Sequence, residues 1–333
     1  MYYNWEKNIV EEELNNVVKL VQNGEVIIFP TETVYGIGAN ALDANAVKKV
    51  FEAKNRPLDN PLIVLVSKKE DIKKVAQNIS EIEQILIDNF MPGPFTLVLE
   101  KKESVPDIVS AGSSYVGVRI PDNKIAQKII EMSGVPIVGP SANISGKLSG
   151  TNVQDIKEEL ENKVSVIIDG GQTSIGIEST IVKVIDGIPT ILRPGKVTIE
   201  EIEKVVGKVN INENSGVKHK HYTPTTPCRL IYSEIEDKQI ELINNQILKN
   251  ENNVVVLCLE EHIEKINIDK DKIINIGSNK DLEIIMHNVF TAIRKADKYN
   301  VKLILIEGVK KEGLGLAIMN RLLNACGNDY IEE

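Results

Sequence analysis

The chain has few of the groups that serve as protein nucleophiles or metal ligands. Its 333 residues hold four histidines and three cysteines, no histidine precedes His219, and no cysteine precedes Cys228. A site in the first two thirds therefore cannot use a Ser-His, Cys-His or metal-His device. The odd number of cysteines, without CxxC spacing, indicates neither a disulfide framework nor a zinc site. We expect chemistry there to rest on positioning and electrostatics, with no covalent nucleophile and no protein-held metal.

Aromatic residues and excess positive charge are also scarce. Aromatics make up 4% of the chain and the net charge is −9 at pH 7. This balance argues against base stacking or the wrapping of a long nucleic acid as the main function. No stretch reaches the roughly 18 uninterrupted apolar residues of a membrane span. The acidic N-terminal stretch lacks the pattern of a signal peptide. We therefore expect a cytoplasmic protein without membrane contact.

What the chain does contain is typical of a globular α/β protein. With 42% hydrophobic and 26% charged residues, its 333 residues suit two domains. Short β-rich apolar runs alternate with amphipathic helical patterns. Strands are predicted at 26–30, 62–66, 95–99 and 116–120, and near 164–168, 180–185 and 190–193, and residues 136–139 form a short apolar segment. Helices are predicted at 43–54, 80–90, 123–132 and 198–206. We expect an α/β sheet with helices packed on it, and not a simple βαβ repeat, because several strands follow one another without room for a helix.

The composition changes after residue 206. Residues 207–227 are polar and end in a Pro-Thr run, which is typical of a linker. Helical and strand patterns then resume, with strands at 254–259, 272–276 and 302–306 and helices at 236–248, 281–298 and 314–325. We expect a first domain over 1–206, a linker over 207–227, and a smaller Rossmann-like α/β domain over 228–333.

Five polar clusters in the first domain are candidates for binding. Each has a simpler explanation when taken alone, such as a polar turn or cations favoured at the end of a helix. No Walker loop and no GxGxxG motif is present. The clusters are PTETVYGIG (30–38), KNRPLDNPL (54–62), VRIP (118–121), GPSANISG (139–146), and GIEST (176–180) with LRPG (192–195).

Taken in this order, the clusters resemble the YrdC-like domain of threonylcarbamoyl-AMP synthases. The resemblance covers roughly residues 10–206 and includes PGPFTLVL between the second and third clusters. It continues into KHKHYTP (218–224) and AIMNRL (317–322), which are similar to the linker and C-terminal domain of the long, two-domain members. The resemblance implies a YrdC-like twisted mixed sheet with helices, followed by the smaller α/β domain.

The resemblance also implies a reaction and a set of contacts. Such enzymes are nucleotidyltransferases that join L-threonine, bicarbonate and ATP, with Mg²⁺ on the triphosphate, into threonylcarbamoyl-AMP and pyrophosphate. The product serves the threonylcarbamoyladenosine modification at position 37 of tRNA, through a downstream transferase machinery. By similarity, ATP would bind to Lys54, Arg56, Asn60, Tyr115, Ser141, Asn143, Ser149, Arg193 and Tyr222. L-threonine would bind to Thr33, Leu65, Arg119, Gly139 and Ser179, with Arg119 pairing its carboxylate.

Three features depart from the family's pattern. Leu65 stands where the family usually has His, which removes one expected threonine contact, and Tyr115 stands where it often has Thr. The linker is shorter than in many long members, and SGVKHKHY (215–222) replaces their usual form, so closure by Tyr222 is the least secure contact.

Two other functions stay open at this point. One is a carbamoyl-transfer enzyme of hydrogenase maturation, which would carry acylphosphatase-like and zinc modules that this chain lacks. The other is an RNA-binding module, and a weak direct contact with tRNA also stays open.

Overall fold

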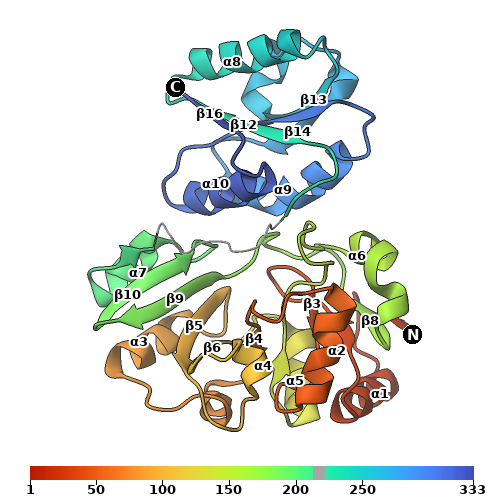
Figure 1. The fold of residues 1–333 in the computed structure, drawn as a ribbon, viewed down its shortest axis with the longest axis vertical. Helices are drawn as coiled ribbons and strands as arrows, with labels where there is room; N and C mark the ends of the chain where they lie inside the picture. The colour runs from red at the N-terminus through yellow and green to blue at the C-terminus, as the bar shows by residue number, and fades with distance from the viewer. Residues whose placement is uncertain (213–221) are drawn as a thin grey trace. The chain divides into compact units, whose positions relative to one another are not determined.

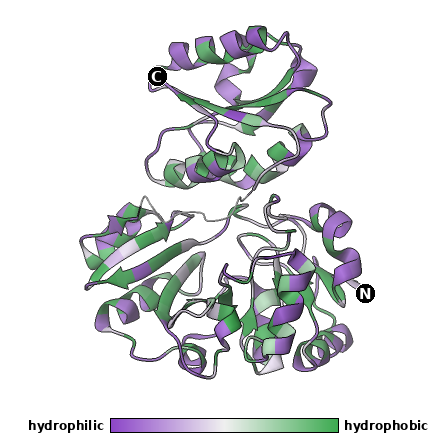
Figure 2. Cartoon of the chain, viewed as in Figure 1, coloured by the Kyte–Doolittle hydropathy of each residue, from purple (hydrophilic) through white to green (hydrophobic). Residues whose placement is uncertain are grey.

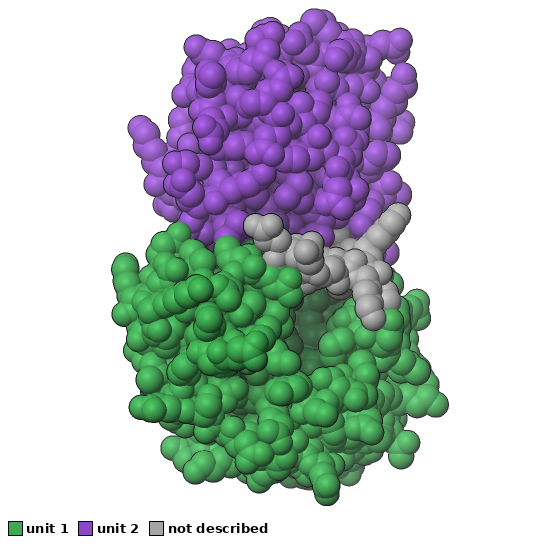
Figure 3. Space-filling model, turned by 60° about the vertical axis from the view of Figure 1, so that its left-hand side comes forward, with its two compact units in different colours: residues 1–145, 149–216 green, residues 146–148, 217–333 purple. Residues whose placement is uncertain are grey.

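The computed structural model describes residues 1–212 and 222–333. The chain divides into two compact units, coloured separately in Figure 3. Unit 1 comprises Met1–Ser145 and Ser149–Gly216, and unit 2 comprises Gly146–Leu148 and Val217–Glu333. Within the described residues, no helix is long and apolar enough to cross a membrane.

Unit 1 contains two sheets. The smaller sheet has the order β1 (Tyr2–Asn4), β8 (Val166–Asp169), β2 (Ile27–Phe29) and β3 (Gly36–Gly38). The larger sheet has the order β11 (Asn210–Ile211), β10 (Ile188–Arg193), β9 (Thr180–Ile185), β5 (Phe95–Glu100), β6 (Tyr115–Arg119), β4 (Ile63–Leu65) and β7 (Ile137–Val138). Both sheets mix parallel and antiparallel pairs: β4 runs parallel to β6, whereas β5 and β6 are antiparallel. The mixed sheet that the resemblance implies is confirmed.

Several helices of unit 1 begin at residues whose side chains cap them. Asp43 caps α2 by accepting from the backbone amides of Asn45 and Ala46, and Ser80 forms a capping box with Glu83 at the start of α3. The helices are α1 (Glu11–Gln22), α2 (Ala44–Lys54), α3 (Glu81–Phe90), α4 (Asp107–Ser110), α5 (Lys124–Ser133), α6 (Val153–Leu160) and α7 (Ile199–Val206), with 3₁₀ turns η1 (Lys69–Lys74) and η2 (Glu161–Lys163).

The core of unit 1 follows from this arrangement. Strands carry the apolar residues, and helices turn their polar faces outward (Figure 2). One cluster joins Val47 and Phe51 of α2 to Leu97 and Val118 of the larger sheet. A second cluster holds Trp5, α1 and α5 against the smaller sheet and includes Leu65. These two clusters form the packed base from which the loops of the candidate site extend.

Unit 2 is a parallel sheet with helices on both faces, as Figure 1 shows for α8 on one side and α9 and α10 on the other. Its order is β14 (Ile273–Gly277), β13 (Val254–Leu259), β15 (Leu303–Glu307), β12 (Cys228–Tyr232) and β16 (Tyr330–Glu332). The helices are α8 (Glu236–Lys249), α9 (Leu282–Ala296) and α10 (Leu314–Ala325), with 3₁₀ turns η3 (Glu260–Lys265) and η4 (Lys270–Lys272). The expected Rossmann-like second domain is confirmed.

The predicted linker 207–227 falls into three parts. Asn210 and Ile211 form β11, which pairs with β10 and so extends the larger sheet of unit 1. Residues 213–221, which include the first part of the KHKHYTP motif, lie outside the described residues. The backbone amides of Thr225 and Thr226 donate to the carboxylate of Asp297, at 2.9 and 2.6 Å, within unit 2. The position of the linker over an active site stays a prediction.

Candidate functional site

The carboxyl end of α2 carries a buried lysine. Lys54 is 1% exposed, and its ammonium donates to the carbonyls of Ser141 and Asn143, the second at 2.7 Å. Burial holds the pKa of Lys54 well below its usual value, and the neighbouring charge of Arg56 acts in the same direction. The lysine thus ties the end of α2 to the GPSANISG segment. It thereby joins the KNRPLDNPL and GPSANISG clusters, which lie far apart in the sequence.

Arg56 follows directly after a turn of the chain. Asn55 adopts the left-handed conformation, with φ of 50°, and ends α2. The Arg56 guanidinium then donates from Nε to the carbonyl of Asn60 at 3.0 Å, and from Nη2 to Asn60 Oδ1 at 2.7 Å and the Pro61 carbonyl at 2.8 Å. These bonds fix the plane of a half-exposed cation. A cation held in this way suits an anionic group such as phosphate.

The GPSANISG segment runs beside the PTETVYGIG segment. Gly36 and Ser141 form an antiparallel bridge, and the amide of Ala142 donates to the carbonyl of Tyr35 at 2.7 Å. The hydroxyl of Ser141 donates to Asn143 Oδ1 at 2.6 Å. The structure therefore brings the first, second and fourth sequence clusters together in one unit.

Arg119 ends strand β6 and is buried. Its Nη1 donates to Thr33 Oγ1 at 3.0 Å and its Nε to the carbonyl of Gly93 at 3.1 Å, and Nη2 lies 2.6 Å from Glu32 Oε1. Arginine and glutamate are both 7% exposed at the side chain. Arg119, which the resemblance assigns to a substrate carboxylate, thus lies beside Thr33 and faces a protein carboxylate, and its role toward a substrate stays a prediction.

Ser179 and Arg193 form another connected group. Arg193 donates to the Ser179 carbonyl from Nε at 3.1 Å and from Nη2 at 2.8 Å, and its Nη2 also reaches Ser179 Oγ at 3.2 Å. The hydroxyl of Ser179 pairs with that of Thr96 at 2.8 Å. Ser149, fully buried, donates its hydroxyl to the carboxylate of Glu178. Ser179, predicted to bind L-threonine, and Arg193, predicted to bind ATP, are therefore in direct contact, and both roles stay predictions.

Leu65 and Gly139 lie against each other. Leu65 is 1% exposed and packs in the apolar cluster of Ile27, Phe29 and Ile137. A Cβ added to Gly139 would overlap the side chain of Leu65. At the position where the resemblance implies a polar histidine, this chain thus has an apolar side chain that fills the space beside a glycine.

Two tyrosines predicted to bind ATP make none of the contacts described above. Tyr115 lies at the far end of β6 in unit 1, and Tyr222 belongs to unit 2. Tyr115 is 41% exposed at the start of β6, the end opposite to Arg119, with Lys183 Nζ 3.6 Å from the centre of its ring. Tyr222 belongs to unit 2, where its ring packs 5.1 Å from that of Phe290. Both roles toward ATP stay predictions.

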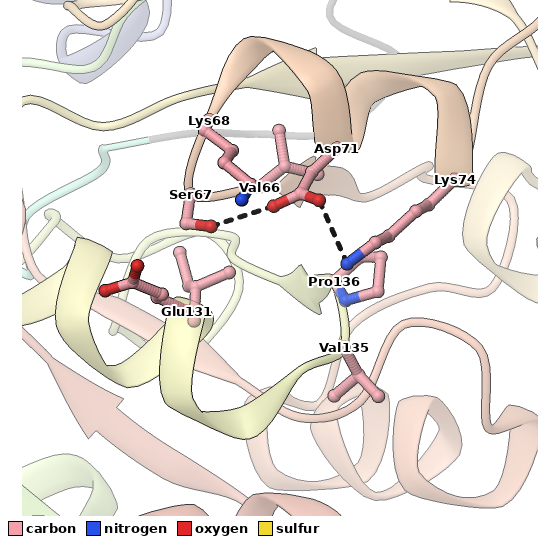
Figure 4. A pocket seen from close by; sticks show the side chains of 9 residues that line it. Val66, Ser67, Lys68, Asp71, Lys74, Glu131, Val135 and Pro136 are labelled. Carbon is pink, nitrogen blue, oxygen red and sulfur yellow. Dashed lines mark hydrogen bonds and ion pairs between the residues drawn. The ribbon is translucent and has the colours of Figure 1, made fainter.

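A separate hollow lies just beyond β4 (Figure 4). It is lined by Ser67, Lys68, Asp71, Lys74 and Glu131 together with apolar side chains. Burial raises the pKa of Asp71, but hydrogen bonds from Lys74 and Ser67 outweigh it and bring the pKa below its usual value. Because Asp71 is already paired with Lys74 at 3.0 Å and Ser67 at 2.9 Å, the hollow presents a neutralised carboxylate.

Comparison with known proteins adds the deciding observation. The Sua5/YciO/YrdC family model, described as "Telomere recombination", matches residues 19–195, and the model of the threonylcarbamoyl-AMP synthase C-terminal domain matches residues 197–327. Threonylcarbamoyl-AMP synthase of Pyrococcus abyssi is 40% identical over 99% of this chain and 98% of its own length. The Bacillus subtilis protein of the same name is 37% identical over 96% and 95%.

This chain belongs to the threonylcarbamoyl-AMP synthase family. It is a two-domain Sua5-type member, as the matches over both units show. The crystal structure of Pyrococcus abyssi Sua5 complexed with L-threonine has a TM-score of 0.93 at 40% identity and covers 100% of this chain and 99% of its own. The family identified from the motif order, and the fold implied by it, are both confirmed.

Two acidic residues of the site were missed by sequence reasoning. Glu32 faces Arg119, and Glu178 accepts from Ser149. Both stand inside candidate motifs, PTETVYGIG and GIEST, in which only hydroxyl-bearing side chains were assigned to binding. The available signal was that each is the single acidic residue of its motif.

Proposed function

We propose that unit 1 makes L-threonylcarbamoyl-AMP and pyrophosphate from L-threonine, bicarbonate and ATP. The chain is a nucleotidyltransferase of the threonylcarbamoyl-AMP synthase family, with full-length relatives of that name at 34–40% identity. The observation that carries the finer proposal is the tie between Lys54 and the GPSANISG segment, because that segment also pairs with the PTETVYGIG segment, whose Thr33 contacts the buried Arg119.

The reaction needs no protein nucleophile. The threonine amine attacks the carbon of bicarbonate, water leaves, and a carbamate forms. A carbamate oxygen then attacks the α-phosphorus of ATP, and the bond to pyrophosphate breaks. The protein's task is to orient the three reactants and to offset negative charge on the phosphates.

The residues divide into two groups in this proposal. Arg56 offers phosphate an oriented fork, while Lys54, Ser141 and Asn143 hold the segment beside it. On the other side, Arg119 would pair the threonine carboxylate, with Thr33 and Ser179 as hydroxyl partners. Figure 3 shows that the surface of unit 1 is hollowed on the face turned to the viewer.

Magnesium enters this proposal only as part of the ATP substrate. Within residues 1–212 and 222–333, no three His, Cys, Asp or Glu side chains are grouped as metal ligands. The Mg²⁺ on the triphosphate, the downstream threonylcarbamoyl transferase, a weak tRNA contact and the cytoplasmic location all stay predictions.

The direct test is the dependence of pyrophosphate release on threonine. The protein is incubated with MgATP, bicarbonate and labelled L-threonine, and both pyrophosphate and labelled nucleotide product are measured. We expect release only when all three substrates are present. Release that continues without threonine would contradict the proposed reaction. Tight binding to tRNA at physiological salt without turnover would favour the RNA-binding alternative.

A further inference from the structure

Glu32 is a buried acidic side chain that the proposed function leaves without a role. It follows β2 in the PTETVYGIG segment and is 7% exposed. Its backbone carbonyl accepts from the amide of Ile175 at 2.9 Å and from Ser174 Oγ at 3.3 Å. The amide of Gly176 donates to the carbonyl of the next residue, Thr33, at 3.0 Å. The loop that carries Glu32 is therefore fixed by its neighbours.

The carboxylate of Glu32 has a charged neighbour but makes no hydrogen bond. Oε1 lies 2.6 Å from Arg119 Nη2, in an ion pair, yet both carboxylate oxygens and Nη2 are buried without a hydrogen-bond partner, and Oε2 has no ion-pair partner either. Arg119 is held on its other edges by Thr33 Oγ1 and by the carbonyl of Gly93. A carboxylate accepts several hydrogen bonds, and leaving a buried oxygen without one is costly.

An α-amino acid complements this pair of charges. Its carboxylate suits the guanidinium of Arg119 and its ammonium suits the carboxylate of Glu32, so a zwitterion satisfies both partners at once. An isolated buried ion pair is only marginally favourable, because desolvation offsets the attraction. Exchanging the internal pair for two charge-assisted contacts with a ligand therefore costs little and supplies the partner that Oε2 lacks.

We propose that Glu32 binds the ammonium group of threonine and accepts its proton. This inference rests on the proposed function of the site. The step balances as follows: the threonine ammonium gives one proton to Glu32 Oε2, and the freed nitrogen lone pair forms a bond to the bicarbonate carbon. A carbon–oxygen bond of bicarbonate breaks, water leaves, and threonine carbamate remains with a neutral Glu32. Glu32 is thereby a catalytic residue and also selects for ligands that carry an amine.

Binding of two ligands to one variant tests the ammonium contact. Calorimetry measures the affinity of L-threonine and of 3-hydroxybutanoate, which keeps the carboxylate and hydroxyl but lacks the amine. For Glu32→Gln we expect threonine affinity to fall about 10- to 100-fold, since a charge-assisted bond is removed. Affinity for 3-hydroxybutanoate should stay the same or rise, because Arg119 loses its competing carboxylate.

The outcomes separate the alternatives. An equal loss for both ligands would show that Glu32 acts only by positioning Arg119, and unchanged threonine binding would show no contact; either result overturns the proposal. Glu52→Gln is the matched control, because the Glu52 carboxylate is exposed and only pairs with Lys48 across one helical turn. If Glu32→Gln fails to fold, Glu32→Asp takes its place: a shorter carboxylate should weaken threonine binding and spare that of 3-hydroxybutanoate.

Kinetics then test the proton transfer. Threonine-dependent pyrophosphate release by the unaltered protein must be present first; its absence would overturn the proposed function and not the Glu32 role alone. With activity present, Glu32→Gln should lower kcat by about 100-fold at saturating threonine. That loss should shrink as rising pH deprotonates the free amine. A kcat deficit that is the same at every pH would overturn the role as proton acceptor.

Discussion

The ammonium of Lys54 donates to the carbonyl of Asn143 at 2.7 Å, across 89 positions of sequence. A second bond reaches the carbonyl of Ser141. A buried cation is costly unless backbone dipoles replace its water, and these carbonyls do so. Lys54 is therefore a structural tie for the GPSANISG segment, and its own contact with ATP phosphates stays a prediction.

Replacing Lys54 with methionine tests this tie. Lys54→Met keeps the length of the side chain but leaves two carbonyls without a donor, so we expect a loss of about 1–3 kcal/mol in the free energy of unfolding. Activity should fall further than the loss of folded protein explains. Urea denaturation and pyrophosphate release measure the two effects. The control is Lys48→Met on the exposed face of the same helix. Equal stability of the two variants would show that the tie contributes nothing.

Arg56 should matter for activity and little for stability. It is half exposed, so Arg56→Ala should change the melting temperature by no more than a surface substitution does. If the fork meets phosphate, kcat/KM should drop by about 100-fold or more. Arg56→Lys keeps the charge but lacks the planar guanidinium, so its kcat/KM should lie between those of the unaltered protein and of Arg56→Ala. Lys68→Ala, in the hollow beyond β4, is the matched surface control. Full turnover by Arg56→Ala would contradict the phosphate assignment.

The sequence patterns predicted the larger elements well because their burial is periodic. The helix over 43–54 was marked by Asp43 and by Val47, Val50 and Phe51 on one face, and the structure has α2 there. Short strands such as β3 carry no such pattern: its three residues, GIG, form a strand because they pair with β2 in the smaller sheet, where Ile37 lies opposite Ile28. Helix α1 was also missed, although Leu14, Val17, Val18 and Val21 are buried on one face.

The site was predictable as a set of motifs and not as a set of contacts. Motif order led to Arg119 and Thr33, which the structure joins at 3.0 Å. Nothing in the order indicates that Glu32 would occupy the other edge of Arg119, because that contact depends on where β2 and β6 end in two different sheets. The effect of Leu65 likewise depends on its packing partner, Gly139.

Leu65 and Gly139 should show coupled stabilities. Gly139→Ala places a methyl group into the Leu65 side chain and should cost about 1–3 kcal/mol. Leu65→Ala should cost about 2–5 kcal/mol by leaving a cavity. In the double variant the new methyl group enters the space that the leucine side chain has left. The double variant should therefore lose less free energy of unfolding than the two single variants lose together, by about 1 kcal/mol or more. Denaturation of all four proteins measures this coupling, and strict additivity would contradict the contact.

His262 of unit 2 should make stability depend on pH. It is buried, with Nδ1 against Glu307 and Nε2 3.1 Å from Glu236. The hydrogen bond with Glu307 raises the pKa of His262 above its usual value, against the opposing effect of burial. In the unfolded chain the pKa is about 6.5. The stabilisation is therefore complete below that pH and is lost as pH rises through the higher folded-state pKa.

Comparison with His262→Gln checks this sign. The stability advantage of the unaltered protein over the variant should be largest near pH 6 and should shrink at higher pH. Side-chain NMR titration should place the folded-state pKa of His262 above about 6.5. His287→Gln, in α9 of the same unit, controls for the substitution itself. An advantage that grows with pH would mean that His262 is buried in its neutral form, and that the bond to Glu307 joins a neutral imidazole to the buried carboxylate.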